Sequence, residues 1–276
     1  MKIEMREKNK KKKYFLLLIL LLPIIGYFVF IYNHEEDILE VNNNEAPIID
    51  NKKEEIEEEE IVIEEPHYEE FFPVVEGQQA YVVTPKKFDG DKAILILYSH
   101  GSNTTVTQNM KDQFMKDLQS YGILFTKDNY IFAASNQHGV NWGNPESIQD
   151  TLNLKDWVNE RYDIKEKVYL LGFSMGGLPT MNFATTYPDI IEKIALLAPT
   201  TKSSSWNQER ANTLKDTNIK LWHGNKDVNV PYSYSVSFVN KMEEYGILID
   251  FITLEGKGHF DIDTEYSEDI LEFFES

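Results

Sequence analysis

Short apolar runs alternate with amphipathic stretches from about residue 71 to the end of the chain. The runs that predict strands cover 80–85, 93–98, 130–134, 168–171, 191–197, 219–222 and 248–254. Apolar residues at helical spacing predict helices over 107–121, 148–162, 178–185, 207–214, 232–245 and 266–274. We expect 80–85 to be an edge strand, because Pro85 ends it. Strands that alternate with helices predict an α/β fold with a mostly parallel, doubly wound sheet and helices on both faces.

The longest apolar run lies near the N-terminus and covers 14–32, with Pro23 and Gly26 inside it. Nineteen residues of helix extend about 28 Å, close to the thickness of a bilayer's hydrocarbon core. Lysines at 10–13 precede the run, so the positive-inside rule keeps residues 1–13 in the cytoplasm. We therefore expect a single-pass anchor in the cell membrane, with the rest of the chain outside.

A cleaved signal peptide is the alternative interpretation of this run. Its apolar region would be shorter and would end at a pair of small residues, whereas this run ends in the bulky residues 27–32. The residues favour an uncleaved anchor, and they leave cleavage open.

Charge and composition describe the segment between the anchor and the predicted domain. The formal net charge is -19, and most of the excess comes from acidic residues between 35 and 70. Such a segment is expected to be a solvated, disordered linker over 33–70, followed by one domain over 71–276. The chain shows no basic groove, so a nucleic-acid partner is not expected. It has no cysteine, which excludes disulfides and a thiol nucleophile.

The candidate chemistry centres on Gly172-Phe173-Ser174-Met175-Gly176, directly after a predicted buried strand. A Gly-x-Ser-x-Gly between a strand and a helix is typical of a nucleophile elbow, in which the serine hydroxyl lies at the tip of a strained turn. Glycine is needed two residues before and after the serine because the chain approaches itself closely there. The backbone N–H of Met175 is then placed to stabilise an oxyanion.

Two further strand ends supply partners for Ser174. Asp227 follows the strand 219–222, and His259 follows the strand 248–254. The carboxyl ends of parallel strands meet at one edge of the sheet, so the three side chains are expected to lie together. His259 would take the proton of Ser174 and return it to the leaving group, while Asp227 would orient and stabilise the imidazole.

Other loops at this edge offer weaker candidates. The N–H of Ser102, after the strand 93–98, is a candidate second oxyanion donor. The loop 135–145 is long and polar, which suggests substrate contacts through His138 and Trp142. His100 and His223 are expected to anchor loops. No metal site is expected, because no His/Asp/Glu pair has ligand spacing on a helix.

Taken together, the elbow, His100-Gly101, the loop 224–227 and Gly258-His259 resemble the α/β-hydrolase superfamily over roughly 71–276. Within it, the chain is similar to the compact serine esterases and peptidases related to dienelactone hydrolases, carboxylesterases and the prolyl oligopeptidase catalytic domain. The resemblance implies a Ser-His-Asp triad, hydrolysis of an ester, thioester or amide, and no cofactor. The interval 199–218 has room for one short helix, so we expect a minimal cap and an open site.

Several functions are compatible with these residues. The first is a membrane-anchored serine hydrolase outside the cytoplasm that cleaves small-molecule or lipid esters through an acyl-enzyme. A serine peptidase or an acyltransferase of the same fold is the alternative, and a non-catalytic surface binding module is a third. Retention of Ser174, Asp227 and His259 argues against the last. The residues do not indicate an oligomeric state.

Overall fold

The computed structural model describes residues 65–276. The basic N-terminus, the expected anchor at 14–32 and nearly all of the expected linker lie outside the described residues. Among the helices of residues 65–276, none combines the length and the apolarity needed to cross a bilayer.

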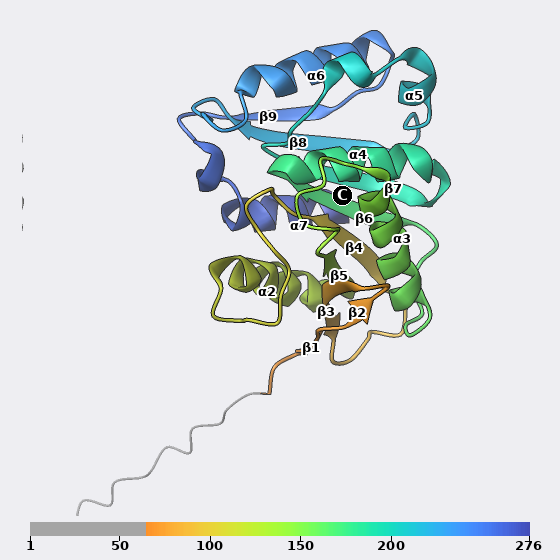
Figure 1. The fold of residues 1–276 in the computed structure, drawn as a ribbon. Coiled ribbons are helices and arrows are strands. Elements are labelled where there is room, and N and C mark those ends of the chain that lie inside the picture. Colours follow the sequence, from red (N-terminus) through yellow and green to blue (C-terminus); the bar gives the residue numbers. More distant parts are fainter. Residues whose placement is uncertain (1–64) are drawn as a thin grey trace, which may run out of the picture. The chain divides into compact units, whose positions relative to one another are not determined.

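A mostly parallel sheet forms the centre of the domain (Figure 1). The strands of residues 65–276 are β1 (Tyr68–Phe71), β2 (Val74–Val75), β3 (Gln78–Pro85), β4 (Ile94–Ser99), β5 (Tyr130–Ser135), β6 (Val168–Phe173), β7 (Ile191–Leu197), β8 (Asn218–Gly224) and β9 (Asp250–Leu254). Their order is β1-β3-β5-β4-β6-β7-β8-β9, and β2 pairs with β3 outside this path. Along this order, the strands β5, β4, β6, β7, β8 and β9 pair in parallel. Strands β1 and β3 are antiparallel to their neighbours.

Helices cover both faces of the sheet, as the alternating pattern predicts (Figure 1). The helices are α2 (Gln113–Phe125), α3 (Pro145–Asn159), α4 (Gly177–Thr186), α5 (Gln208–Asn212), α6 (Tyr232–Glu244) and α7 (Ser267–Glu275). One buried cluster joins the sheet to α3, α4, α5 and α6, and a second joins it to α2 and α7. Along β4, Leu95 and Leu97 belong to the first cluster, and Ile96 and Tyr98 to the second. This alternation explains why the strand is continuously apolar.

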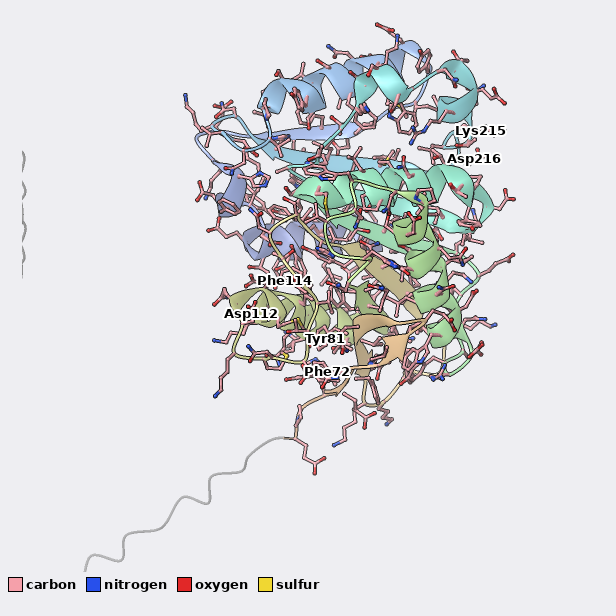
Figure 2. All side chains as sticks on the ribbon, in the orientation of Figure 1. Phe72, Tyr81, Asp112, Phe114, Lys215 and Asp216 are labelled. Atoms are coloured by element: carbon pink, nitrogen blue, oxygen red, sulfur yellow. The ribbon has the colours of Figure 1, made fainter. Side chains whose placement is uncertain are left out.

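The expectation that 80–85 forms an edge strand is wrong. β3 lies between β5 and an added outer strand, β1, which begins at Tyr68 inside the segment expected to be linker. The Tyr81 hydroxyl of β3 donates a hydrogen bond to the Glu70 carboxylate of β1. The ring of Tyr81 also packs against Phe72, with centroids 5.2 Å apart (Figure 2). Pro85 is tolerated because it is the last residue of β3.

The helix expected over 107–121 starts later, at Gln113, and ends at Phe125. Asp112 sets this start, because its Oδ1 accepts a hydrogen bond from the backbone N–H of Phe114 at 2.9 Å (Figure 2). An aspartate that satisfies a free N–H of the first turn is a favourable helix cap. Residues 107–112 form irregular chain, bends and one turn instead of helix.

The chain between β7 and β8 contains one α-helix, the five-residue α5, and a short turn at Ser203–Ser205. The cap is therefore minimal, as expected. Beyond β9, the C-terminal helix α7 is held by the buried Lys193 of β7, whose Nζ donates to the backbone oxygens of Phe273, Phe274 and Ser276. Burial lowers the pKa of Lys193, and these three acceptors compensate for the water that the ammonium loses.

Candidate active site

Ser174 lies on a sharp turn between β6 and α4. It follows Phe173 directly and begins a short 3₁₀ turn, Ser174–Gly176, which leads into α4. The φ of Ser174 is 55°, in the left-handed region that residues with a side chain seldom adopt. Such a strained backbone holds the hydroxyl away from both the strand and the helix, which is the geometry of a nucleophile elbow.

The glycines of the motif permit this turn. A Cβ atom at Gly172 would lie 2.5 Å from Thr180 Oγ1 and 2.9 Å from the backbone oxygen of Gly176. A Cβ atom at Gly176 would collide with the backbone oxygen of Ser99, at the end of β4. The two glycines therefore let β4, β6 and α4 approach one another at the elbow.

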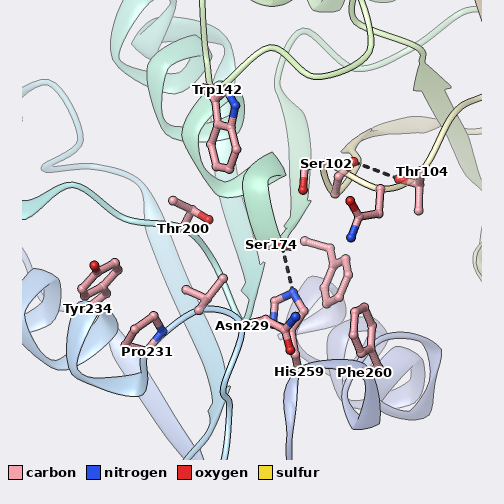
Figure 3. Close-up of a pocket in the computed structure, with 14 residues that line it drawn as sticks. Ser102, Thr104, Trp142, Ser174, Thr200, Asn229, Pro231, Tyr234, His259 and Phe260 are labelled. Atoms are coloured by element: carbon pink, nitrogen blue, oxygen red, sulfur yellow. Dashed lines mark hydrogen bonds between the residues drawn. The ribbon is translucent and has the colours of Figure 1, made fainter. Parts of the chain in front are cut away.

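The structure brings Ser174, His259 and Asp227 together at the carboxyl edge of the sheet. Figure 3 shows the hydrogen bond between Ser174 and His259. His259 Nε2 lies 2.8 Å from Ser174 Oγ, and His259 Nδ1 lies 2.6 Å from Asp227 Oδ2. A carboxylate accepts only, so the imidazole hydrogen belongs on Nδ1, and Nε2 is left to accept from the serine hydroxyl. This arrangement can remove a proton from Ser174 and hold the resulting imidazolium beside an anion.

Asp227 is fully buried but well supplied with hydrogen-bond donors. Its Oδ1 accepts from the backbone N–H groups of Asn229 and Val230, both at 2.8 Å. Its Oδ2 accepts from His259 and from a second histidine, His223, at 3.2 Å. The side chain of Asp227 is 0% exposed and that of His259 is 4% exposed. A buried carboxylate is costly unless it is hydrogen-bonded, and these four donors meet that need.

One expected oxyanion donor, Met175, belongs to the elbow, and the other, Ser102, belongs to the loop after β4. Met175 is buried and is the second residue of the 3₁₀ turn, so its N–H has no acceptor within the turn. Ser102 lines the pocket in front of Ser174. A Cβ atom at the neighbouring Gly101 would lie 3.5 Å from the Cβ of Ser174, so this loop rests against the elbow. His100, which is buried, ties the loop to the backbone oxygen of Asn136 at 2.9 Å.

A pocket of about 480 Å³ opens in front of Ser174 and His259 (Figure 3). Its lining residues are Gly101, Ser102, Asn103, Thr104, Trp142, Phe173, Ser174, Thr200, Asn229, Val230, Pro231, Tyr234, His259 and Phe260. None of these is Asp, Glu, Lys or Arg. The lining combines aromatic rings with neutral hydroxyl and amide groups, a composition suited to an uncharged ligand.

The two expected substrate contacts have different positions. Trp142 lines the pocket and is 55% exposed, and its φ of 49° lies in the left-handed region. His138 does not line this pocket. Its Nδ1 lies 2.6 Å from the buried carboxylate of Asp150, in α3, and this bond holds the loop against that helix. Burial raises the pKa of Asp150, and its bond to His138 opposes that rise.

Sequence reasoning missed several pocket residues, although they stand next to expected ones. Phe260 follows His259 directly, and Asn229 lies two residues after Asp227. Thr200 comes three residues after the end of β7, and Tyr234 lies in the first turn of α6. The end of β7 is the signal that would have found Thr200. Within residues 65–276, no group of three or more His, Asp or Glu is arranged to hold a metal ion.

We predict that Gly172→Ala destabilises the chain by about 1–3 kcal/mol, the usual cost of overpacking a tight contact. The reason is the short distance from the added methyl to Thr180 and Gly176. Thermal unfolding of wild type and variant measures the loss. Gly101→Ala is the matched control, because a Cβ there would meet its neighbours at an ordinary 3.5 Å. Equal losses in the two variants would contradict the proposed role of Gly172.

Comparison with solved structures gives the same fold at low sequence identity. The match to Est1E from Butyrivibrio proteoclasticus covers 74% of this chain and 97% of Est1E, with a TM-score of 0.55 and 16% identity. A putative dipeptidyl aminopeptidase IV from Bacteroides ovatus matches 76% of the chain, with a TM-score of 0.62 and 15% identity. An acylaminoacyl peptidase from Pyrococcus horikoshii matches 75%, with a TM-score of 0.58 and 15% identity.

This chain spans less than half of either peptidase: the matches cover 36% of the Bacteroides protein and 41% of the Pyrococcus protein. No curated protein matches the chain. The family model for phospholipases and carboxylesterases matches residues 92–276, which is most of the described domain. The chain therefore belongs to the phospholipase/carboxylesterase family of the α/β-hydrolase superfamily.

Proposed function

We propose that the chain is a serine hydrolase that cleaves carboxylic esters of uncharged acyl groups. The observation that carries this proposal is the continuous set of hydrogen bonds from Ser174 through His259 to the buried Asp227. The positive φ of Ser174 adds support, because a strained serine at the tip of a turn is hard to explain as a purely structural feature.

The reaction follows from the positions of these groups. His259 Nε2 takes the hydroxyl proton as Ser174 Oγ attacks the ester carbonyl carbon, and Asp227 stabilises the imidazolium. The N–H groups of Met175 and Ser102 stabilise the oxyanion. His259 then gives its proton to the departing alkoxide, which leaves an acyl-enzyme on Ser174. A water molecule, deprotonated by His259, attacks the acyl carbon. The bond to Ser174 Oγ then breaks, His259 returns the proton to that oxygen, and the acid is released.

The pocket favours an ester over a peptide with a free terminus. An exopeptidase that reads an α-amino group needs a carboxylate near the site, and one that reads an α-carboxylate needs a cation. The pocket lining described above contains neither. Trp142 and Phe260 instead offer exposed aromatic surface close to Ser174, and in the view of Figure 3 Ser174 lies between them. This surface suits the apolar part of an acyl group or its alcohol.

The proposal also includes an anchor at residues 14–32 that places the hydrolase on the outer side of the cell membrane. Its support is the uncharged apolar run itself and the lysines at 10–13 that precede it. An acidic segment would separate the span from the domain. The substrate would then come from the envelope or the surroundings of the cell.

We predict that Ser174→Ala lowers kcat/KM for a short p-nitrophenyl ester by at least about 10⁴-fold, since the nucleophile is lost. Steady-state assays of the full-length chain measure the loss. Ser120→Ala, an exposed serine of α2, is the control and is expected to retain wild-type activity. A Ser174→Ala variant with a tenth or more of the wild-type rate would rule out the proposed nucleophile.

Trp142→Ala is expected to change the preference among acyl groups more than kcat/KM for the smallest ester. Loss of the indole surface should lower kcat/KM about tenfold for an ester with a bulky aromatic acyl group, because an aromatic contact of this size is removed. The acetate ester should be hardly affected. Leu248→Ala, which is exposed and outside the pocket, is the control. A proportional loss with both esters would show that Trp142 does not select the acyl group.

The anchor is tested by fractionating cells that express the full chain or a version without residues 14–32. The full chain should remain with the membranes after a high-salt wash, while the shortened version should not. Protease added to intact cells should digest the domain. Recovery of a free protein that begins after residue 32 would instead identify a cleaved signal peptide.

A further inference from the structure

A second histidine, His223, contacts the same oxygen of Asp227 that His259 contacts. It lies at the end of β8 and its side chain is 0% exposed. Its Nε2 lies 3.2 Å from Asp227 Oδ2 and 3.0 Å from the backbone oxygen of Val230. Its Nδ1 lies 2.7 Å from the hydroxyl of Ser235, in α6. The Val230 contact is the loop anchoring that the sequence suggested, while the Asp227 contact is an additional feature.

The partners of His223 determine where its hydrogen lies. A carbonyl and a carboxylate accept only, so Nε2 carries the hydrogen and shares it between Val230 and Asp227. Nδ1 then carries no hydrogen, and it accepts a hydrogen bond from the Ser235 hydroxyl. This assignment leaves each polar atom of the ring with a suitable partner and requires no net charge on His223.

Burial favours the neutral ring, because it lowers the pKa of His223, although the nearby Asp227 and Val230 oxygens oppose this shift. The neutral state matters for the site. A charged His223 would form an ion pair with Asp227 and weaken the attraction between Asp227 and an imidazolium at His259. A neutral N–H donor holds the carboxylate in place and leaves its charge available.

Asp227 needs such a donor because its two oxygens are held differently. Oδ1 is fixed by the backbone N–H groups of Asn229 and Val230. Oδ2 can still swing about that point, and its other partner, His259, takes up and releases a proton at Nε2 during the reaction. His223 is the partner of Oδ2 that does not take part in proton transfer.

We propose that His223 is a positioning residue that fixes Asp227 Oδ2, and through it the ring of His259, toward Ser174. This inference rests on the proposed function, since it assigns His223 a role in the same reaction. It differs from simple loop anchoring, because the hydrogen bond to Asp227 should affect the chemical step more than substrate binding.

Three substitutions in the full-length chain test whether catalysis needs the N–H donor at the Nε2 position of His223. His223→Leu removes all three polar contacts of the ring, to Asp227, Val230 and Ser235. In His223→Asn, the shorter amide occupies the position of Nδ1, so it reaches Ser235 but neither Asp227 nor Val230. In His223→Gln, the longer amide occupies the position of Nε2 and can donate to Asp227 and Val230. Thr126→Val removes a buried hydrogen bond to Gly122 at a position that does not line the pocket, and it controls for lost stability.

We expect kcat for a p-nitrophenyl ester to fall about ten- to a hundredfold in His223→Leu and His223→Asn, the effect of losing one hydrogen bond to a charged group. KM should stay within about twofold. His223→Gln should recover most of kcat, and Thr126→Val should keep it. His223→Asn retains a polar partner for Ser235, so it supplies the result if the leucine variant does not fold.

Two results would overturn the inference. One is a folded His223→Asn variant with wild-type kcat, which would mean that the bond to Asp227 is dispensable. The other is a His223→Gln variant as slow as His223→Asn, which would mean that the donor position is irrelevant. Failure of the proposed function is recognised separately, because the wild-type chain would then hydrolyse no ester at all.

Discussion

The close approach of β4, β6 and α4 at Ser174 is the constraint on which the site depends. Gly172 and Gly176 remove the side chains that would keep these elements apart. The turn that results gives Ser174 a positive φ and places it at the pocket. The same approach brings the loop after β4, with Ser102, against the elbow. A parallel sheet with its strand ends at one edge then delivers Asp227 and His259 to the same place.

The site also requires that the carboxylate of Asp227 stay ionised while it is buried. The side chain of Asp227 has no exposed surface, and it is surrounded by two backbone N–H groups and two imidazole donors. Donors without net charge stabilise the anion but do not cancel its field. The pocket lining follows the same principle, since it holds polar groups and rings but no Asp, Glu, Lys or Arg. A pocket without Asp, Glu, Lys or Arg, next to the buried anion of Asp227, suits proton transfer between Ser174 and His259. It is less suited to binding an ionic substrate.

Most of the fold was predictable because buried strands of a parallel sheet are continuous apolar runs. Strand β1 was missed because its sequence, YEEF, has two adjacent glutamates between its aromatic residues, so it is neither an apolar run nor an alternating pattern, and it follows an acidic segment. Helix α2 was placed too early because Met110 fits its apolar spacing, whereas Asp112 sets its start. At the site, chain order was enough to select Ser174, Asp227 and His259. The bond from His223 to Asp227 and the position of Tyr234 depend on how loops fold back, which no local pattern encodes.

Mass spectrometry of the full-length chain can establish whether Ser174 forms a covalent intermediate. After reaction with a fluorophosphonate, we expect a single adduct, located by peptide mapping on Ser174. Prior incubation with an ester substrate should slow its formation. An adduct on a different residue, or no adduct on a chain that hydrolyses esters, would contradict the account.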